Sequence, residues 1–386
     1  MSPAGPDVVE QALGLSRADG CVVVAGESSR VVLRWAGNSL TTNGADRDRS
    51  LTVVSVVGEG FGVRSASSYD DVEELVRASE QAAREAAPAE DAGPLVEGDA
   101  SPDFAAPAPI ADPAALAGFA HDLGERLAAA RADGLRLYGY ADAEESTTWL
   151  GSSTGLRLRH SAPKGYVELT GKDDRPGGSS WVAQSTRDWS DVDVGGLDAE
   201  LRRRLAWGAR SLELPAGRYE SLLAPSAVAD LMVSAYWRMS GRDAAEGRSV
   251  FSRPGGGTRV GERLGPAGLR LWSDPHDPLL GTTPFVVAGS SSSVSSVFDN
   301  GLPAPATDWV RDGELAALVE TRASAGSRGV PVTPYVHNLS LDAGGTSTVD
   351  EMVARTERGL LLTCLWYIRE VDPQTLLVTG LTRDGV

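Results

Sequence analysis

The side chains able to bind a metal or act as a nucleophile are few and widely spaced in this sequence of 386 residues. They are four histidines and two cysteines: His121, His160, His276, His337, Cys21 and Cys364. No two of the histidines lie within a few helical turns of each other, and no Cys-x-x-Cys pair is present, so any metal site must be assembled from distant segments. Because the two cysteines also lie far apart in the chain, we expect reduced thiols rather than a disulfide framework.

Two of these residues have local contexts that suggest a role, and a third is a candidate without one. In "SDPHDP", His276 lies between Asp274 and Asp277, which is either a set of metal ligands or ordinary Asp-Pro turn chemistry, and we favour the turn. Cys364 lies in the apolar run "TERGLLLTCLWYI", where a free cysteine usually packs as a small hydrophobic side chain. His337 has no other ligand near it in the sequence, and remains a candidate only for a site built from scattered residues.

Two small-residue stretches invite other chemistry. "GEGFG", residues 58–62, follows an apolar strand pattern, but a dinucleotide loop opens directly into a helix, whereas "VRSAS" continues as strand. We therefore expect a glycine-rich hairpin. The serines of 290–296 lack the Gly-x-Ser-x-Gly frame of a nucleophile and have no histidine beside them, so we expect a loop.

The overall charge excludes one class of partner. The chain carries 36 basic and 53 acidic residues, a net charge of -17, which repels the phosphates of nucleic acids. No apolar run reaches the roughly 18–20 residues of a membrane span, and the N-terminus lacks a basic start and an apolar stretch. We expect a cytoplasmic protein that contacts neither nucleic acid nor membrane.

The elements in the first half alternate between strands and helices. Apolar β-rich runs at 21–26, 29–40 and 50–65 precede a helical pattern at 67–87, with Ser68 or Asp70 as its N-cap. We take residues 1–90 as an N-terminal α+β domain. Residues 87–113 are rich in Pro, Ala and acids and are typical of a linker.

The second half predicts a middle segment and a C-terminal domain. Residues 114–215 read as a helix, a meander of antiparallel strands and a closing helix that carries Leu212 on its apolar face. Residues 216–386 predict a mostly antiparallel β domain, in which Thr348 and Glu351 form a capping box and Gly359 ends the helix. The fold class is therefore α+β, with long helices on an antiparallel N-terminal sheet.

The sequence ends on a turn signal. "LTRDGV" has Asp384-Gly385 in the turn of a hairpin and only Val386 after it, so we expect a C-terminal domain that is incomplete at its end.

Several segments, taken in order, resemble one family. "NSLTTNGADRDRSLTVVSVVGEGFGVRSASSYDDVEELVRASEQAA", "GRYESLLAPSAVADLMV", "FDNGLPAPATDWVRDGEL" and "GGTSTVDEMVARTERGLLLTCLWYIREVDPQTLLVTGLTRDGV" are similar to consecutive parts of the TldD/PmbA family. The resemblance implies an N-terminal α+β domain, a mostly antiparallel C-terminal domain and a link to zinc peptidase chemistry.

The family's metal motif is missing from the matching helix. TldD subunits resemble zinc peptidases with His-Glu-x-x-x-His on a helix, in which two imidazoles hold Zn²⁺ and the Glu acts as general base. Here "SAVADLMVSAYWRMSGRDAAEGRSVF" contains no histidine, and its Ser240-Gly241 resembles the PmbA (TldE) branch that partners a TldD subunit. Cys364, the counterpart of a C-terminal ligand by analogy, falls later than expected when counted from Gly359.

The same helix carries Tyr236, Trp237 and Met239 where the metal site would otherwise be built. One interpretation is core packing. The other is that these side chains fill the vacant pocket or face a partner subunit, since aromatics and Met are enriched in interface cores.

The resemblance implies a PmbA/TldE-like subunit without cofactor, which completes a zinc metallopeptidase acting on peptides or unfolded polypeptides, with zinc on a TldD-like partner. One alternative is a self-sufficient metallohydrolase with scattered ligands such as His276, His337 and Cys364. The other is a regulatory protein of the gyrase-modulator type.

Overall fold

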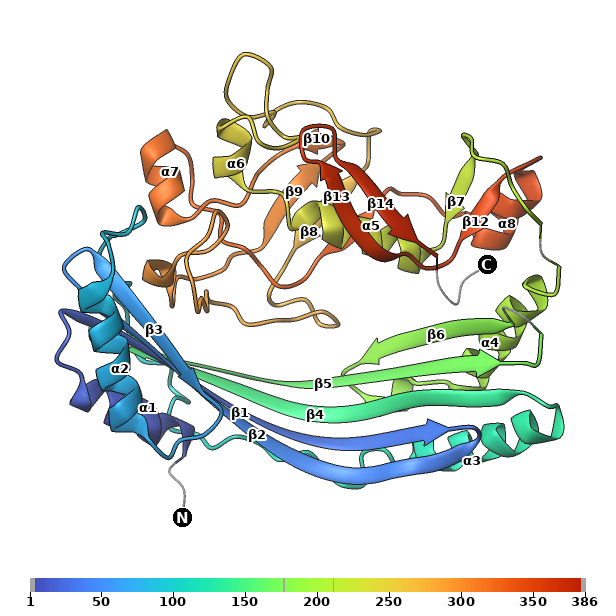
Figure 1. The fold of residues 1–386 in the computed structure, drawn as a ribbon, viewed down its shortest axis with the longest axis horizontal. Coiled ribbons are helices and arrows are strands. Elements are labelled where there is room, and N and C mark those ends of the chain that lie inside the picture. The colour runs from blue at the N-terminus through green and yellow to red at the C-terminus, as the bar shows by residue number, and fades with distance from the viewer. Residues whose placement is uncertain (1–3, 176–177, 211, 383–386) are drawn as a thin grey trace.

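The chain folds into two layers, seen edge-on in Figure 1. The computed structural model describes residues 4–175, 178–210 and 212–382. A long curved sheet with helices on its outer face forms one layer, and the C-terminal part of the chain lies over the inner face. The predicted α+β class, with antiparallel sheets and helices, is confirmed.

The sheet has six strands, all antiparallel, in the order β3-β2-β1-β4-β5-β6. Their bounds are β1 Gly20–Ala36, β2 Ser39–Val57, β3 Gly60–Ala66, β4 Arg136–Ser152, β5 Arg157–Lys172 and β6 Ser179–Thr186. The runs predicted at 21–26 and 29–40 belong mainly to one strand, β1. The polar residues 41–49 were not predicted as strand, yet they extend β2 because their backbone pairs with β1 except at a bulge at Thr41, while both faces stay largely exposed.

Four helices cover the outer face of the sheet: α1 Gly5–Leu15, α2 Val72–Glu85, α3 Ala117–Ala132 and α4 Val194–Trp207. Helices α1 and α2 pack on one end of the sheet around Trp149, and α3 and α4 pack on the other around Trp35. Two details differ from the prediction. The N-cap of α2 is Asp71, neither Ser68 nor Asp70, and Leu212 lies beyond the end of α4 and is exposed.

The two layers meet mainly at one end. Phe298 packs edge-on against Phe61, with ring centroids 5.9 Å apart, within a buried cluster that both layers supply. At the opposite end Arg203 of α4 pairs with Asp350, 3.0 Å apart, on the surface. Residues 87–113 run along the sheet from β3 toward α3, and the N–H of Ala111 donates to the Ser29 hydroxyl at 3.2 Å. Strands from both sides of this segment thus belong to one sheet.

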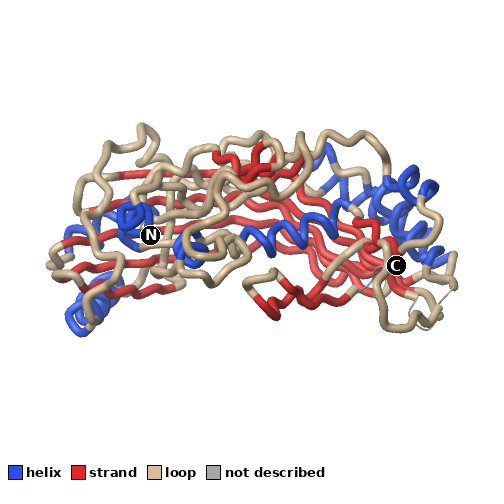
Figure 2. The backbone as a smooth tube through the Cα atoms, turned by 90° about the horizontal axis from the view of Figure 1, so that it is seen from above, coloured by secondary structure: helices blue, strands red, loops and turns tan. Residues whose placement is uncertain are grey.

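The C-terminal part is built of short elements joined by loops, which cross above the long strands in Figure 2. One antiparallel sheet has the order β10-β9-β8-β11, β13 and β14 form a hairpin, and β12 pairs in parallel with β7. The bounds are β7 Ser221–Leu223, α5 Pro225–Tyr236, α6 Gly241–Ala245, β8 Arg270–Ser273, β9 Thr307–Arg311, β10 Glu314–Leu315, α7 Arg322–Arg328, β11 Ser340–Asp342, α8 Val349–Arg355, β12 Leu360–Leu362, β13 Trp366–Asp372 and β14 Leu377–Leu381.

The end of the chain follows the prediction in part. The capping box of Thr348 and Glu351 is present at the start of α8. The helix ends at Arg355, before Gly359, because the next residues turn to bring Leu360 beside β7, where its N–H donates to the Glu220 carbonyl. The hairpin predicted at Asp384-Gly385 lies outside the described residues. Among the helices of the described segments, none has the length and apolar character needed to cross a membrane.

Candidate functional site

Helix α5 ends where the family resemblance would place a metal site, and its last side chains divide between core and surface. Tyr236 and Met239 are buried, with 2% and 1% of their surface exposed, in the core that also holds Trp309. Trp237, the C-cap residue of α5, is 62% exposed. Core packing, the first interpretation of this segment, therefore describes Tyr236 and Met239, whereas Trp237 faces outward.

Tyr236 fixes the position of a neighbouring segment, residues 335–337. Its hydroxyl donates to the carbonyl oxygen of Val336 and accepts from the N–H of the same residue, each at 3.0 Å. Its ring stacks on Tyr335 with centroids 4.5 Å apart, and the Tyr335 ring meets the His337 ring edge-on at 5.1 Å. Helix α5 thereby holds Tyr335 and His337 beside Trp237.

The Ser-Gly pair that follows α5 has a structural reason. Ser240 caps α6, since its hydroxyl accepts from the Asp243 N–H and donates to the Ser293 carbonyl, both at 3.0 Å. Gly241 leaves room for a buried carboxylate, because a Cβ at this position would lie 1.7 Å from Oε1 of Glu320. Glu320 is paired with Arg328 at 2.9 Å and accepts from Ser324 at 2.7 Å. Burial nevertheless raises the pKa of this carboxyl above its ordinary value.

A pocket of about 510 Å³ opens between these residues and the serine-rich loop. Aromatic and aliphatic side chains form much of its wall, and the backbone of 286–290 forms another part. The lining residues are Trp237, Phe285, Val286, Val287, Ala288, Gly289, Ser290, Val294, Ser295, Ser296, Asp299, Glu320, Thr321, Pro334, Tyr335 and His337. A largely apolar pocket with a few fixed polar groups is the usual form of a ligand site.

The charged groups of the pocket are already neutralised by partners. Asp299 accepts from Arg322 at 2.7 Å through the guanidinium and at 3.1 Å through the backbone. Glu320 is held by Arg328, as described above. Partial burial lowers the pKa of the His337 imidazole, although the residue as a whole is exposed. The pocket therefore presents mainly apolar surface and the His337 imidazole to a ligand.

These residues do not fit a catalytic zinc ion. Such a site needs about three protein ligands on one metal, but the carboxylates here are bound to arginines and only His337 is available. Within the described residues, no group of three or more His, Cys, Asp or Glu side chains is placed to hold a metal ion. The structure does not bring His276, His337 and Cys364 together as one ligand set.

The other candidates lie elsewhere. His276 is in a turn in which Asp274 accepts from the His276 N–H at 2.9 Å, and Asp277 accepts from the Leu279 and Leu280 N–H groups. Cys364 is buried at the break between β12 and β13, next to Leu365, whose N–H donates to Asp230. Neither Cys21 nor Cys364 forms a disulfide bond.

The two small-residue stretches also have structural explanations. Gly58 takes a left-handed φ of 59° in the tight turn between β2 and β3, which confirms the hairpin predicted for 58–62. The serine loop is tied down by its hydroxyls, because Ser293 donates to Asp243 at 2.7 Å and Ser296 donates to Asp91 at 2.6 Å.

Sequence reasoning missed Asp299, Glu320 and Tyr335 as pocket residues. Only Asp299 had a signal, since it belongs to the "FDNG" turn that was noted for its resemblance. In that turn the Asn300 side chain accepts from the Ala288 N–H at 2.7 Å and donates to its carbonyl at 2.9 Å, which fixes the backbone wall of the pocket.

Known proteins share parts of this sequence and this fold. Residues 216–386 match the family model described as the PmbA/TldA metallopeptidase C-terminal domain. A search of curated proteins gave no match.

Solved structures share the fold along nearly the whole chain. TldE from Thermococcus kodakarensis is 16% identical, with a TM-score of 0.73 over 93% of this chain and 82% of that one. A putative modulator of DNA gyrase from Thermotoga maritima MSB8 is 15% identical, with a TM-score of 0.71 over the same shares. A putative modulator of DNA gyrase from Bacteroides thetaiotaomicron VPI-5482 is 14% identical, with a TM-score of 0.75 over 97% of this chain and 89% of that one.

At these identities the solved structures establish the fold, and the family model matches the C-terminal part of the chain alone. Residues 216–386 are thus similar to the C-terminal domain of PmbA/TldA metallopeptidases, and the chain as a whole shares its fold with TldE and with the two putative gyrase modulators.

Proposed function

We propose that this chain is a PmbA/TldE-like subunit that binds peptide without a catalytic metal of its own and completes a two-subunit metallopeptidase. Its partner is a TldD-like chain, which supplies zinc, the general base and the activated water. The substrates are peptides or unfolded polypeptides, and the complex works in the cytoplasm.

The main support for this proposal is that the side chain at the end of α5 packs in the core instead of pointing into an open site. A metal-binding helix must direct two ligands into an open site, whereas Tyr236 is buried here and its hydroxyl hydrogen-bonds to the Val336 backbone. A helix end that is committed to packing supports a role in building the pocket rather than in chemistry.

The composition of the pocket supports peptide as its ligand. Trp237 offers a large exposed aromatic face, and such side chains dominate the energetics of protein-binding sites. Because Asp299 and Glu320 are paired with arginines, the pocket suits uncharged side chains. The net charge of -17 favours a protein ligand over a nucleic acid.

Metal analysis of the purified chain alone tests this proposal. We expect zinc well below one atom per chain after purification without chelators, together with measurable binding of an unstructured peptide. About one zinc per chain, with peptide cleavage in the absence of any partner, would instead establish the self-sufficient metallohydrolase. Failure to bind peptide, together with binding to gyrase, would establish the regulatory alternative.

A further inference from the structure

Strand β5 has a free edge over part of its length. Strand β6 pairs with β5 only from Gly165 to Lys172, and on that same side Ala100 forms an isolated bridge with Arg157. Between these two contacts, no segment of the described chain hydrogen-bonds to that side of β5. The free edge therefore spans residues 158–164.

The register between β4 and β5 determines which backbone groups of β5 point toward the free edge. The Leu156 carbonyl accepts from Ser152 at the start of the β4–β5 pairing, whereas the Arg157 carbonyl accepts from Ser101 on the opposite side. Because backbone groups alternate along an antiparallel strand, the N–H and C=O groups of Arg159 and Ser161, and the C=O of Pro163, point away from β4. Such a row of unpaired groups is a template for an added strand.

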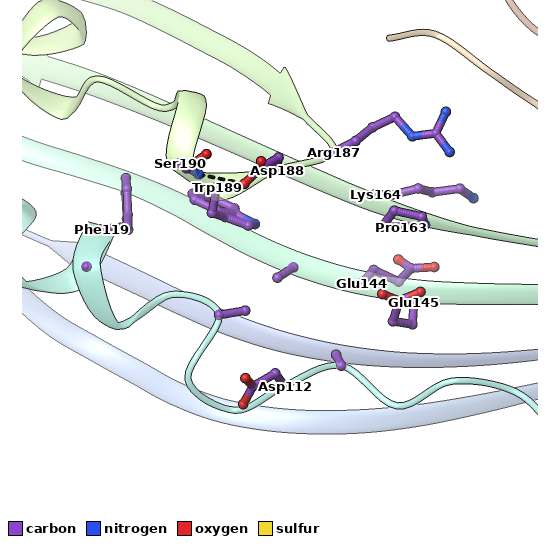
Figure 3. Close-up of a pocket in the computed structure, with 14 residues that line it drawn as sticks. Asp112, Phe119, Glu144, Glu145, Pro163, Lys164, Arg187, Asp188, Trp189 and Ser190 are labelled. Atoms are coloured by element: carbon purple, nitrogen blue, oxygen red, sulfur yellow. Dashed lines mark hydrogen bonds between the residues drawn. The ribbon is translucent and has the colours of Figure 1, made fainter. Parts of the chain in front are cut away.

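A pocket of about 640 Å³ lies where this edge meets the turn after β6 (Figure 3). Pro163 and Lys164 line one side and residues 187–190 line another. The indole Nε1 of Trp189 is buried there without a hydrogen-bond partner, and a Cβ on Gly165 would lie 2.9 Å from it. The end of the free edge thus offers space and an unused donor.

Two basic side chains extend together from this pocket. Figure 3 shows Lys164 and Arg187 pointing the same way, away from Asp112. The pKa of His160 is lowered first by burial and then by the charges of Arg187, Lys164, His276 and Arg159, so both basic side chains of the pocket lie near His160. The turn of His276 reaches the same place, because a Cβ on Gly281 would lie 2.6 Å from Nη1 of Arg187.

The positive charge on Lys164 and Arg187 is not neutralised within the described part of the chain. Neither residue forms an ion pair there, although Glu144 lies opposite Lys164 in the β4–β5 register. Arg159, on the same strand as Lys164, does form an ion pair, with Asp103 at 2.8 Å. Acidic residues also line this pocket, namely Asp112, Glu144, Glu145 and Asp188. Lys164 and Arg187 point away from Asp112 (Figure 3), and their charges are complementary to a carboxylate.

We propose that the free edge of β5 binds an extended peptide as an additional strand, with a carboxylate of that peptide held by Lys164 and Arg187. Backbone hydrogen bonds to Arg159, Ser161 and Pro163 would supply affinity, and the two basic side chains would supply selectivity. The proposal deepens the proposed function, since it rests on peptide being the ligand of this subunit, but it concerns a surface separate from the pocket at Trp237.

Charge reversal tests the carboxylate contact, and the chain offers a matched control. Its only two lysines, Lys164 and Lys172, both lie on β5. The probes are four labelled, extended peptides. Each has one central Glu or Gln and either a free or an amidated C-terminus. Fluorescence anisotropy measures the affinity of the chain for each peptide. We expect the wild-type chain to prefer a carboxylate-bearing peptide by about tenfold, Lys164→Glu to abolish this preference and Lys172→Glu to preserve it.

The arms of this experiment separate the possible results. If the affinity depends on the central Glu, the bound group is a side-chain carboxylate. If it depends on the free C-terminus, the bound group is the terminal carboxylate. Either result supports the site. Equal binding of all four peptides to the wild-type chain, or equal losses in Lys164→Glu and Lys172→Glu, overturns it.

Backbone methylation of the peptide tests strand addition itself. N-methyl groups on alternate residues block edge pairing in one register and leave the other free. We expect only one of the two methylated series to lose binding, whereas equal behaviour of both would contradict the added strand. If Trp237→Ala removes peptide affinity while Lys164→Glu changes nothing, the proposed function stands and the β5 site fails. The reverse pattern keeps the β5 site and removes the pocket.

Discussion

The hydroxyl group of Tyr236 is bonded twice to one residue, since it donates to the carbonyl oxygen of Val336 and accepts from its N–H group, each at 3.0 Å. This pair of bonds joins the end of α5 to the segment that carries Tyr335 and His337. The buried residue at the end of α5 thus fixes the position of two side chains that line the pocket.

Replacing Tyr236 with Phe tests this coupling. Both Val336 backbone groups would be left buried without a partner, so we expect a loss of about 1–3 kcal/mol in the free energy of unfolding, measured by urea denaturation. The exposed Tyr367 provides the control, and Tyr367→Phe should leave stability within about 0.5 kcal/mol of wild type. Equal stability of Tyr236→Phe and wild type would show that the two bonds do not hold the segment.

A substitution at Gly241 tests whether the buried Glu320 carboxylate requires a residue without a side chain beside it. Because a Cβ would meet Oε1 of this paired carboxylate at 1.7 Å, we expect Gly241→Ala to destabilise the chain by about 2 kcal/mol or more. The control is Gly326→Ala in α7, where nothing lies within 4 Å of the new Cβ. There the helix should become more stable by up to about 1 kcal/mol. Thermal unfolding of both variants measures the contrast, and a Gly241→Ala protein as stable as wild type would contradict it.

The lowered pKa of His160 predicts that the free energy of unfolding depends on pH. Its pKa is lowered from 6.5 by burial and by neighbouring positive charges, so the unfolded chain takes up a proton before the folded chain does. Stability should therefore fall as the pH drops below about 6.5, until the lowered pKa is passed.

The pH dependence can be assigned with two histidine variants. In urea denaturation at pH 8 and pH 5.5, His160→Asn should lose less stability on acidification than wild type. His121→Asn, at an exposed position of α3, should behave like wild type. Identical pH profiles for His160→Asn and wild type would rule out this contribution.

Much of the fold could be predicted because local signals were strong. The capping box of Thr348 and Glu351, the turn at Gly58 and the apolar helix patterns are all determined by near neighbours in the sequence. The strand of residues 41–49 could not be predicted from its polar side chains, because it depends on pairing with β1. The exposure of Leu212 likewise depends on where α4 ends.

The site was harder to predict than the fold. The sequence pointed to Tyr236, Trp237 and Met239 together, but only the tertiary packing separates the buried pair from the exposed Trp237. Glu320 and Tyr335 carried no signal at all, since their roles arise from contacts with Gly241 and Tyr236, roughly 80 to 100 positions away in the sequence.

Trp237 tests the pocket directly. Because its side chain is 62% exposed at the pocket wall, we expect Trp237→Ala to weaken binding of an unstructured, uncharged peptide by about tenfold or more while leaving the unfolding temperature nearly unchanged. Tyr367→Ala, which removes an aromatic side chain that is 60% exposed away from the pocket, is the control. Isothermal titration calorimetry measures both affinities, and equal binding by the two variants would remove Trp237 from the site.

The most direct test of the central claim is a titration of a purified TldD-like partner with this chain, with the hydrolysis rate of an unstructured peptide as the readout. The account predicts that this chain alone has no activity and that the rate rises with added chain until one chain is present per partner. It also predicts that Trp237→Ala lowers the plateau or shifts it to higher peptide concentration. A partner that cleaves the peptide equally fast without this chain, or a chain that cleaves it alone, would contradict the account.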